Sequence, residues 1–537
     1  MNRPSRTEAV AETYRWMPCR KVCVLASLCL FLPSLLGAQL SPQQTTGKQI
    51  FTAGASASRT PIEAILGGGT SRIPGRLMPC ASCHGADGQG RPEGGVTPSN
   101  ITWDVLQRPL TSSDPLARRR PAYDTAALRK AIRDGIDPAG NELGLTMPRF
   151  RMSDSDLDSL ILYLHVLGSE SDPGLTNTSI RIGTIIPADG PLAATGAEFS
   201  GLLQAYFNDL NRDGGIYGRH IDFVTLTAKG TPAVITAAAE TFVHDQNIFA
   251  LLGIIAPGAE DQVTEAMQRA GVPVLTPFAS GTATDEDSAK SKIFYILSGL
   301  SQQARVLARF ARQDMEKPVS SIAVVFPEHD QPLADETVHE CRTQSFASVT
   351  PVKYSDFAGE AGGIVESLHK TNVDGILFLG DGRELHDLLL SVKKANWSPP
   401  IFQPGAFAGA NVFEIPREFD QQVYFSFPAL PSDIEVQGLD EYEALVRNHA
   451  LKVTQPLLST SALATAKVLV EGLRESGRQL SRQKLVDTLA AMYNFNTGLT
   501  PPVTFGATRR IGALGGYVVK LDLKKKTLLP VDEWMAP

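Results

Sequence analysis

Short hydrophobic runs alternate with amphipathic windows over the part of the chain that follows residue 180. The runs are rich in β-branched and aliphatic side chains and occur at residues 180–186, 221–226, 248–252, 272–275, 322–326 and 375–379. Between the first two runs, residues 195–211 carry apolar side chains along one helical stripe. Strands that alternate with helices in this order are typical of an α/β fold with parallel sheets. We therefore predict an α/β unit over 180–537.

The preceding part of the chain has a different pattern, in which helices and loops dominate. Residues 47–51 open a short amphipathic helix, and residues 153–167 predict a second helix with apolar side chains at helical spacing. Serine and aspartate occupy the start of that second helix, where they cap its first turn and complement its dipole. A polar segment rich in glycine, proline and serine follows at 169–179. We predict a separate helical unit over 40–168 and a linker over 169–179.

The amino-terminal segment has the pattern of an export signal. Three basic residues within 15–21 precede an apolar run over 22–36, and small residues up to Ala38 follow it. This pattern is typical of a secretory signal peptide, here residues 1–38, although Met17 is an alternative start. The apolar run is short for a bilayer span, and no later run is longer. We expect a periplasmic protein without a membrane span after cleavage.

Composition changes this picture little. A chain of 537 residues with 43% hydrophobic and 20% charged residues is that of an ordinary globular protein with two or three cores. The net charge is −7, and the only short basic run is 118–120, which we interpret as a solvated loop. The balance of charge argues against a nucleic-acid partner.

The most specific motif is Cys80-Ala81-Ser82-Cys83-His84. Two cysteines at this spacing with a histidine directly behind them are typical of covalent attachment of one c-type haem, because each thiol adds to a vinyl group and the histidine ligates the iron. The alternatives are a disulfide or half of a zinc site, but zinc needs four ligands and no second motif of this kind occurs. The other cysteines leave with the signal peptide, except Cys341, which we expect to be a small, partly buried residue.

A methionine in the loop before the second helix is the candidate for the opposite side of the haem. Met147 precedes a proline, and a thioether sulfur is the usual sixth ligand in electron-transfer cytochromes. Met78 and Met152 are its rivals. Met78 is close to Cys80 and so lies on the histidine side, and Met152 lacks a following proline. Iron held by His84 and Met147 has no open position, which favours outer-sphere electron transfer over catalysis.

With these motifs, residues 47–168 resemble a class I cytochrome c. The resemblance rests on a glycine and an aromatic in the first helix, the Cys-x-x-Cys-His motif, the Met-Pro loop and a Tyr-Leu pair in the last helix. It implies an all-α domain in which Cys80 and Cys83 hold the haem and His84 and Met147 ligate its iron. An insertion over 52–79 departs from the family, and we expect it to be flexible and to lie near the haem edge as a docking surface.

Residues near the middle of this domain are candidates for the haem propionates. The segment 108–123 is rich in proline and arginine. We expect this segment to supply partners for the propionates, such as Trp103 or Arg108.

Residues 180–530 resemble the leucine/isoleucine/valine-binding type of periplasmic substrate-binding protein. The resemblance rests on four glycine-containing motifs in the same order as in that family, at 190–193, 214–218, 271–277 and 374–380. It implies a type I fold of two doubly wound α/β lobes that close on a ligand between them. We expect the chain to cross between the lobes near 298–301, 427–432 and 500–505.

The ligand contacts that this resemblance implies are altered here. The family holds the carboxylate of an amino acid with a hydroxyl and backbone amides, and the first such position falls near Ala256, before a proline that lacks both. A hydroxyl remains at Ser280, beside Phe278. In the second lobe, Gln331 and Asp381 fall where pocket aromatics are expected. These five residues are candidate ligand contacts, and a less charged or alcohol-like ligand fits as well as an amino acid.

No enzyme motif of the hydrolase, zinc-protease, nucleotide-triphosphate or dinucleotide class occurs, so we expect no enzyme. We expect a periplasmic cytochrome that transfers single electrons, fused to a small-ligand-binding domain of the ABC-transporter type. One alternative is a solute receptor for an ABC amino-acid transporter with an accessory haem. Another is the electron-acceptor subunit of a periplasmic quinoprotein alcohol dehydrogenase system. We expect three kinds of partner, namely a periplasmic redox protein such as a dehydrogenase, a small-molecule ligand and an ABC permease.

Overall fold

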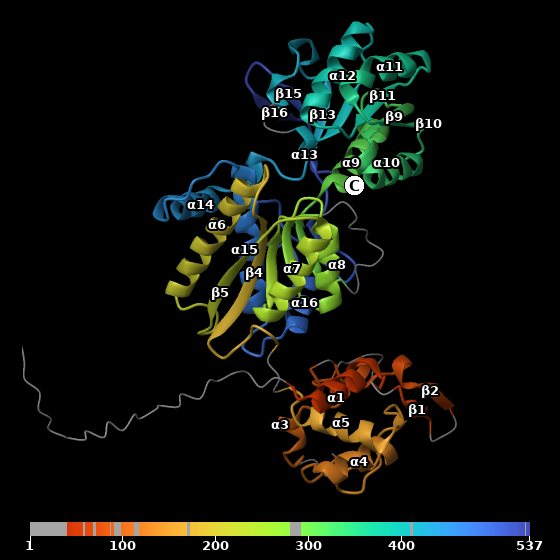
Figure 1. Cartoon of the computed structure of the whole chain (residues 1–537), viewed down its shortest axis with the longest axis vertical. Coiled ribbons are helices and arrows are strands. Elements are labelled where there is room, and N and C mark those ends of the chain that lie inside the picture. Colours follow the sequence, from red (N-terminus) through yellow and green to blue (C-terminus); the bar gives the residue numbers. More distant parts are fainter. Residues whose placement is uncertain are drawn as a thin grey trace, which may run out of the picture.

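The computed structural model describes residues 40–537 except 57–58, 68–70, 86, 91–97, 112–117, 169–171, 280–290, 409–411 and 532. Three sheets organise these residues, one of three strands, one of six and one of seven. The smallest sheet belongs to a helical unit at one end of the molecule, and the two larger sheets form the two lobes of the α/β unit (Figure 1). We call the lobe that contains the six-stranded sheet lobe I and the other lobe II.

Two helices that cross at close range build the amino-terminal unit. α1 (Pro42–Ala53) packs on α5 (Asp154–Leu164), and a Cβ on Gly47 would lie 2.0 Å from the Ser159 carbonyl oxygen. Phe51 and Tyr163 are buried at this crossing, with their ring centroids 5.6 Å apart. The shorter helices around this core are α2 (Cys80–His84), α3 (Trp103–Leu106) and α4 (Thr125–Asp134).

The insertion between α1 and α2 contributes two paired strands, so its described residues are more ordered than we expected. Gly68 and Gly69 lie outside the described residues, and a docking role for the insertion stays a prediction. β1 (Glu63–Leu66) is the central strand, between β2 (Ser71–Pro74) and β3 (Arg149–Arg151), and both pairings are antiparallel. Ile62 and Ala64 are buried in the same core as α1 and α5. The unit is therefore a helical fold with a small added sheet.

Lobe I contains a parallel sheet covered by helices on both faces. Its strand order is β14-β8-β7-β6-β4-β5. The strands are β4 (Ser179–Pro187), β5 (His220–Ala228), β6 (Ala250–Ile254), β7 (Val274–Phe278), β8 (Ile293–Leu297) and β14 (Ile511–Ala513). The helices are α6 (Ala193–Arg212), α7 (Pro232–Asp245), α8 (Glu260–Ala270), α14 (Val436–Asn448), α15 (Pro456–Glu475) and α16 (Arg482–Ala490).

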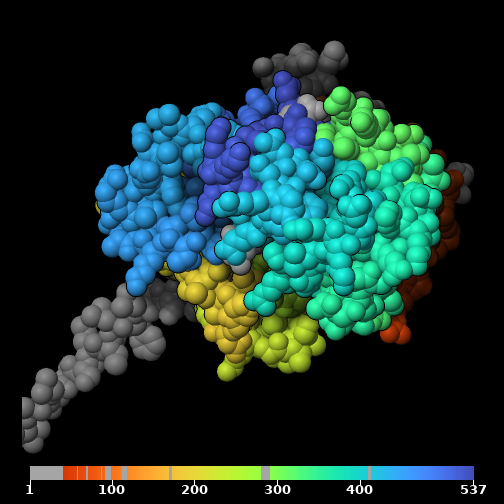
Figure 2. All heavy atoms as spheres, turned by 90° about the horizontal axis from the view of Figure 1, so that it is seen from above, coloured from red at the N-terminus to blue at the C-terminus, as the bar shows by residue number. Residues whose placement is uncertain are grey.

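Lobe II repeats this arrangement and adds an antiparallel edge. Its strand order is β10-β9-β11-β12-β13-β15-β16, and all pairings are parallel except those of β15, which is antiparallel to both β13 and β16. The strands are β9 (Ser321–Pro327), β10 (Ser348–Tyr354), β11 (Gly375–Phe378), β12 (Ile401–Pro404), β13 (Val423–Phe427), β15 (Tyr517–Asp522) and β16 (Thr527–Pro530). The helices are α9 (Leu300–Arg309), α10 (Gln331–Thr343), α11 (Phe357–Lys370), α12 (Gly382–Lys394) and α13 (Gly405–Ala408). Seen from above, lobe II lies over lobe I and nearly hides the amino-terminal unit (Figure 2).

The chain crosses between the lobes three times, as expected, but the third crossing is elsewhere. The first follows β8 at 298–299, and the second lies between β13 and α14 at 428–435. The third lies at 514–516, between β14 and β15, and the predicted segment 500–505 lies within lobe I. The hydroxyl of Ser298 joins two of the crossings, because it donates to the Ala513 carbonyl and accepts from the Gly515 amide.

The described part of the linker is attached to lobe I. Leu175 is buried in the core of that lobe, and the backbone N–H of Arg482 donates to Asp172 at 2.5 Å. At Gly174, which has a φ of +80°, a Cβ would lie 2.2 Å from a backbone oxygen of lobe I. On the other side, Leu167 is buried in the amino-terminal unit. From Gly168 to Asp172 the chain spans at most about 14 Å, so the tether between the units is short.

Candidate functional site

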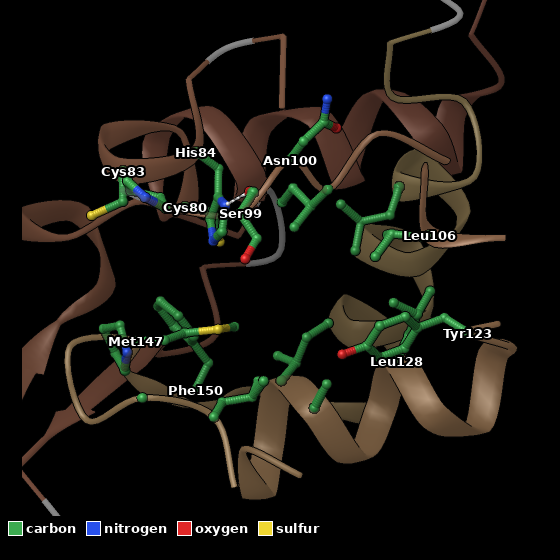
Figure 3. A pocket seen from close by; sticks show the side chains of 18 of the residues that line it. Cys80, Cys83, His84, Ser99, Asn100, Leu106, Tyr123, Leu128, Met147 and Phe150 are labelled. Atoms are coloured by element: carbon green, nitrogen blue, oxygen red, sulfur yellow. Dashed lines mark hydrogen bonds between the residues drawn. The ribbon is translucent and has the colours of Figure 1, made fainter. Parts of the chain in front are cut away.

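An apolar cavity of about 810 Å³ lies inside the amino-terminal unit (Figure 3). This volume is within the range of about 300–1,000 Å³ that is usual for small-molecule and cofactor sites. Helices α1 to α5 and the loops before α3, α4 and β3 contribute to its walls. Most of the side chains that line it are apolar, including Phe51, Leu106, Leu128, Ile132, Leu160 and Leu164.

Helix α2 places the predicted attachment motif along one side of this cavity. Cys80, Cys83 and His84 all line the cavity, and both cysteines are free thiols. The Nδ1 atom of His84 is 2.9 Å from the Ser99 carbonyl oxygen. Since a carbonyl only accepts, Nδ1 carries the proton and Nε2 keeps its lone pair, which is the arrangement that a metal-ligating histidine needs.

Burial favours the uncharged forms of His84 and Cys80. It lowers the pKa of His84 below its ordinary value, although the hydrogen bond to the Ser99 carbonyl opposes this shift. Burial also raises the pKa of the Cys80 thiol to about 12. The neutral imidazole is the form that binds a metal, so this environment favours ligation.

Met147 lies on the opposite side of the cavity from His84, and its thioether is directed into the cavity (Figure 3). Of the two rivals, Met78 also lines the cavity, but it lies two residues before Cys80 on the histidine side. Met152 packs against the core of the unit and is not part of the cavity wall. Ligation by Met147 stays a prediction, and this placement favours Met147 over both rivals.

The residues present fit a covalently attached haem. The cavity is apolar and large enough for a cofactor, a histidine nitrogen with a free lone pair and a thioether sulfur face each other across it, and two thiols lie at its wall. These are the donor types of a c-type haem. Among the described residues, no group of three or more histidine, cysteine, aspartate or glutamate side chains offers a separate metal site.

The polar end of the cavity differs from our expectation for the propionates. Neither Trp103 nor Arg108 lines the cavity. The Trp103 ring contacts that of His165, with centroids 4.1 Å apart and a tilt of 40° between the rings, and Arg108 pairs with Asp104 on the surface. The expectation that these two residues contact the cofactor is therefore not supported by their positions.

Arg118, Arg120 and Tyr123 lie at the cavity instead, with the Tyr123 hydroxyl directed inward (Figure 3). Arg118 and Arg119 are exposed, as expected of a solvated loop, but Arg118 and Arg120 also line the cavity. Arg118 pairs with the buried carboxylate of Asp137 at 2.7 Å, and the guanidinium of Arg120 stands 4.6 Å from the centroid of the Tyr123 ring. Two guanidiniums at one end of the cavity provide positive charge where the anionic groups of a cofactor would be favoured.

In the α/β unit, the predicted ligand contacts follow the carboxyl ends of parallel strands. Ala256 follows β6, Phe278 ends β7, Gln331 begins α10 after β9, and Asp381 follows β11. Ser280 lies outside the described residues. In doubly wound sheets this edge is where ligands bind.

Local hydrogen bonds occupy most of these candidate side chains and amides. Asp381 caps α12 by accepting from the backbone N–H of Arg383 at 2.8 Å and of Glu384 at 3.0 Å. The side-chain amide of Gln331 donates to Asp335 on its own helix, at 2.9 Å. These two residues therefore hold their helices in shape, a role that the sequence analysis did not assign to them.

Acidic side chains also follow the carboxyl ends of the parallel strands in each lobe. The Ala256 amide donates to the Glu260 carboxylate at 3.3 Å, and burial raises the pKa of Glu260 despite hydrogen bonds from backbone amides. In lobe II, the Tyr354 hydroxyl donates to Glu384 at 2.7 Å, and burial raises the pKa of Asp330. Glu260 and Glu384 were not among the predicted contacts, although both lie within four residues of predicted positions.

Two family models match the chain. The model "Periplasmic binding protein" matches residues 179–527, and the model "Cytochrome c" matches residues 76–168. No helix among the described residues is both long and apolar enough to cross a membrane.

Curated relatives resemble the α/β unit at low identity. The chain is 25% identical over 249 residues to the chemotactic signal transduction system substrate-binding protein BasB of Halobacterium salinarum, which is 42% of this chain and 59% of that one. It is 25% identical to the Leu/Ile/Val-binding protein BraC3 of Rhizobium johnstonii, over 39% of this chain and 63% of that one. The chain thus spans about three fifths of these relatives. It covers 85% of a leucine-, isoleucine-, valine-, threonine-, and alanine-binding protein of Pseudomonas aeruginosa, at 23% identity over 61% of its own length.

Solved structures show the same two-lobed fold. A branched chain amino acid ABC transporter protein from Thermus thermophilus with bound valine superposes with a TM-score of 0.54 at 15% identity, over 68% of this chain and 97% of that one. A fatty acid ABC transporter substrate-binding protein from Thermomonospora curvata gives a TM-score of 0.53 at 15% identity, over 68% and 95%. The predicted combination of folds is confirmed. The chain belongs to the periplasmic binding protein family and carries a cytochrome c domain ahead of its binding-protein domain.

Proposed function

We propose that this protein is an exported one-electron carrier whose cytochrome domain is covalently attached to a binding-protein domain. Cys80 and Cys83 would hold one haem c, and His84 and Met147 would ligate its iron. The observation that carries the proposal is the position of His84 and Met147 on opposite sides of one apolar cavity. Bound there, the haem supplies reversible one-electron chemistry.

The chain's own residues would prepare the site for this role. The Ser99 carbonyl fixes the tautomer of His84, so that Nε2 is available to a metal. The apolar wall excludes water, which stabilises the less charged oxidation state and raises the potential. With a ligand from each side, no position is left for a substrate, which supports an electron carrier rather than an enzyme.

For the binding-protein domain we propose a small solute that is neutral or cationic. The backbone amide of Ala256 already donates to a carboxylate of the chain, so a ligand carboxylate would compete with Glu260 for it. Glu384 and Asp381 add further negative charge at the same edge of lobe II. Like charges at short range disfavour an anionic ligand.

The experiment is the absorption spectrum of the purified holoprotein in its oxidised form. We expect a low-spin spectrum with the weak methionine–iron band at the red end, and Met147→Ala should abolish that band. Met152→Ala is the matched control and should retain it, because Met152 does not line the cavity. A wild-type haem that binds carbon monoxide readily, or lacks the band, would refute the proposed ligand set.

A further inference from the structure

The three-stranded sheet of the insertion connects the two sides of the haem cavity. β2 leads through a 3-10 turn at Gly75–Leu77 into the attachment helix α2. β3 begins two residues after Met147. β1 pairs with both strands and so lies between them. The segment before the histidine side and the segment after the methionine are therefore held two strand spacings apart, about 10 Å.

The pairing of β1 with β3 is anchored in the core. Ala64 lies opposite Phe150, and Ile65 lies opposite Arg149. Ala64 is fully buried, and Phe150 is buried and also lines the haem cavity. A shift of β1 relative to β3 by one residue would turn Ala64 away from the core, so burial specifies the register.

The base of the insertion is fixed as well. A Cβ on Gly54 would lie 2.1 Å from the Gly75 carbonyl oxygen, so the two ends of the insertion are in backbone contact. The hydroxyls of Ser56 and Thr60 donate to the carboxylate of Asp156 at the start of α5. Burial raises the pKa of Asp156, but hydrogen bonds from these hydroxyls and from a neighbouring serine outweigh it and lower the pKa.

Arg149 connects the sheet directly to the methionine loop. Its guanidinium donates to the carbonyl oxygen of Met147 at 2.6 Å and to that of Leu143 at 2.9 Å. Arg149 is also the residue of β3 that pairs with Ile65. A displacement of β1 would therefore be transmitted to the Met147 loop through Arg149.

We infer that the insertion is a clamp that positions Met147 for iron ligation, with Ile65 and Arg149 as positioning residues. The inference rests on the proposed ligation by Met147. A thioether can be displaced from ferric iron by an added ligand when its loop opens. The apparent affinity for such a ligand is its intrinsic affinity multiplied by the open fraction of the loop, and the clamp keeps that fraction small.

The test compares imidazole binding to the oxidised holoproteins of wild type, Ile65→Pro and Ile65→Val. Proline removes a backbone N–H from the central strand, whereas valine preserves the strand. We expect Ile65→Pro to bind imidazole about tenfold more tightly, the factor that corresponds to about 1.4 kcal/mol. Ile65→Val should match the wild type. Equal affinity of all three proteins, in a folded Ile65→Pro, would overturn the inference.

A second measurement on the wild type does not depend on folding of a variant. Because coupling is reciprocal, displacement of Met147 by saturating imidazole should loosen the clamp. Hydrogen exchange should then rise in β1 as well as in residues 147–151, and stay unchanged in α15 as an internal control. Faster exchange in 147–151 without a change in β1 would overturn the clamp. A wild-type protein without a methionine–iron band would instead refute the proposed ligand set, so the two failures are distinguishable.

Discussion

The buried ion pair beside the haem cavity gives the sharpest test of what stabilises the cytochrome domain. The Asp137 side chain is 0% exposed and accepts hydrogen bonds from the backbone of Ala139 and Asn141, from the Asn141 side chain and from Arg118. The perturbation is Asp137→Asn, which keeps the shape and removes the charge. The surface pair of Arg108 with Asp104, in the same region of the domain, supplies the matched control Asp104→Asn.

The expected magnitudes differ because the two pairs differ in exposure. Removing one partner of a buried pair costs about 3–5 kcal/mol. The Arg118 side chain is 37% exposed, so we expect the lower end, about 3 kcal/mol, for Asp137→Asn. The side chains of Arg108 and Asp104 are 69% and 64% exposed, and such a pair contributes about 0–1 kcal/mol.

The assay is thermal unfolding followed by haem absorbance, which reports on the cytochrome domain alone. For a domain of this size a loss of 3 kcal/mol lowers Tm by about 10 °C. Asp104→Asn should lower Tm by no more than about 3 °C. Equal and small shifts in Tm for both variants would refute the reasoning that burial determines how much an ion pair contributes to stability.

The lowered pKa of Asp137 predicts how the stability of the domain changes at acid pH. Burial raises the pKa of Asp137, but hydrogen bonds from Asn141, Arg118 and Ala139 together lower it below its ordinary value of 3.8. A lowered folded-state pKa stabilises the fold above the unfolded-state pKa, and this contribution is lost as the pH falls through the folded-state value. The difference in Tm between wild type and Asp137→Asn should therefore be full near pH 7 and shrink below about pH 4. A difference in Tm that stays constant down to pH 2 would contradict the expected loss of this stabilisation at acid pH.

Two further pairs of substitutions test helix packing and helix capping. Gly47→Ala places a Cβ 2.0 Å from the Ser159 carbonyl oxygen, so it should lower the Tm of the cytochrome domain by several degrees. Gly201→Ala, whose Cβ would have nothing within 4 Å, should leave the binding-protein domain unchanged or slightly more stable. Calorimetry that finds the opposite order would contradict the close crossing of α1 and α5. Asp381→Ala removes the cap of α12 and should destabilise the binding-protein domain by about 1 kcal/mol, whereas Asp381→Asn retains a cap. Equal denaturation midpoints for these two variants would show that the cap contributes nothing.

Local motifs made the haem site predictable from the sequence. The spacing of Cys80, Cys83 and His84 is set by bonds to one cofactor, and the structure places all three at one cavity together with Met147. The alternation of apolar runs and amphipathic windows likewise predicted the parallel strands of the two large sheets. Both signals depend on residues that are close in sequence or repeat at a regular period.

The insertion was not predictable in the same way. Its two described strands are four residues each, and β1 finds its second partner, β3, more than eighty residues further on. The third crossing was missed for a related reason, because β14 is a strand of only three residues, one of them a glycine. The role of Arg118 depended on Asp137, nineteen residues away, whose burial no local pattern indicates.

The attachment of the linker limits how the two domains can communicate. Asp172 and Leu175 are held by lobe I, and the hinge segments between the lobes lie at 298–299, 428–435 and 514–516. Closure of lobe II on a solute therefore does not move the end of the tether that lobe I holds. Closure of lobe II would therefore have to act on the cytochrome domain by direct contact rather than by pulling on the tether. Without such contact, the midpoint potential of the haem should be the same before and after addition of a solute that stabilises the binding-protein domain, and a shift in a potentiometric titration would contradict this independence.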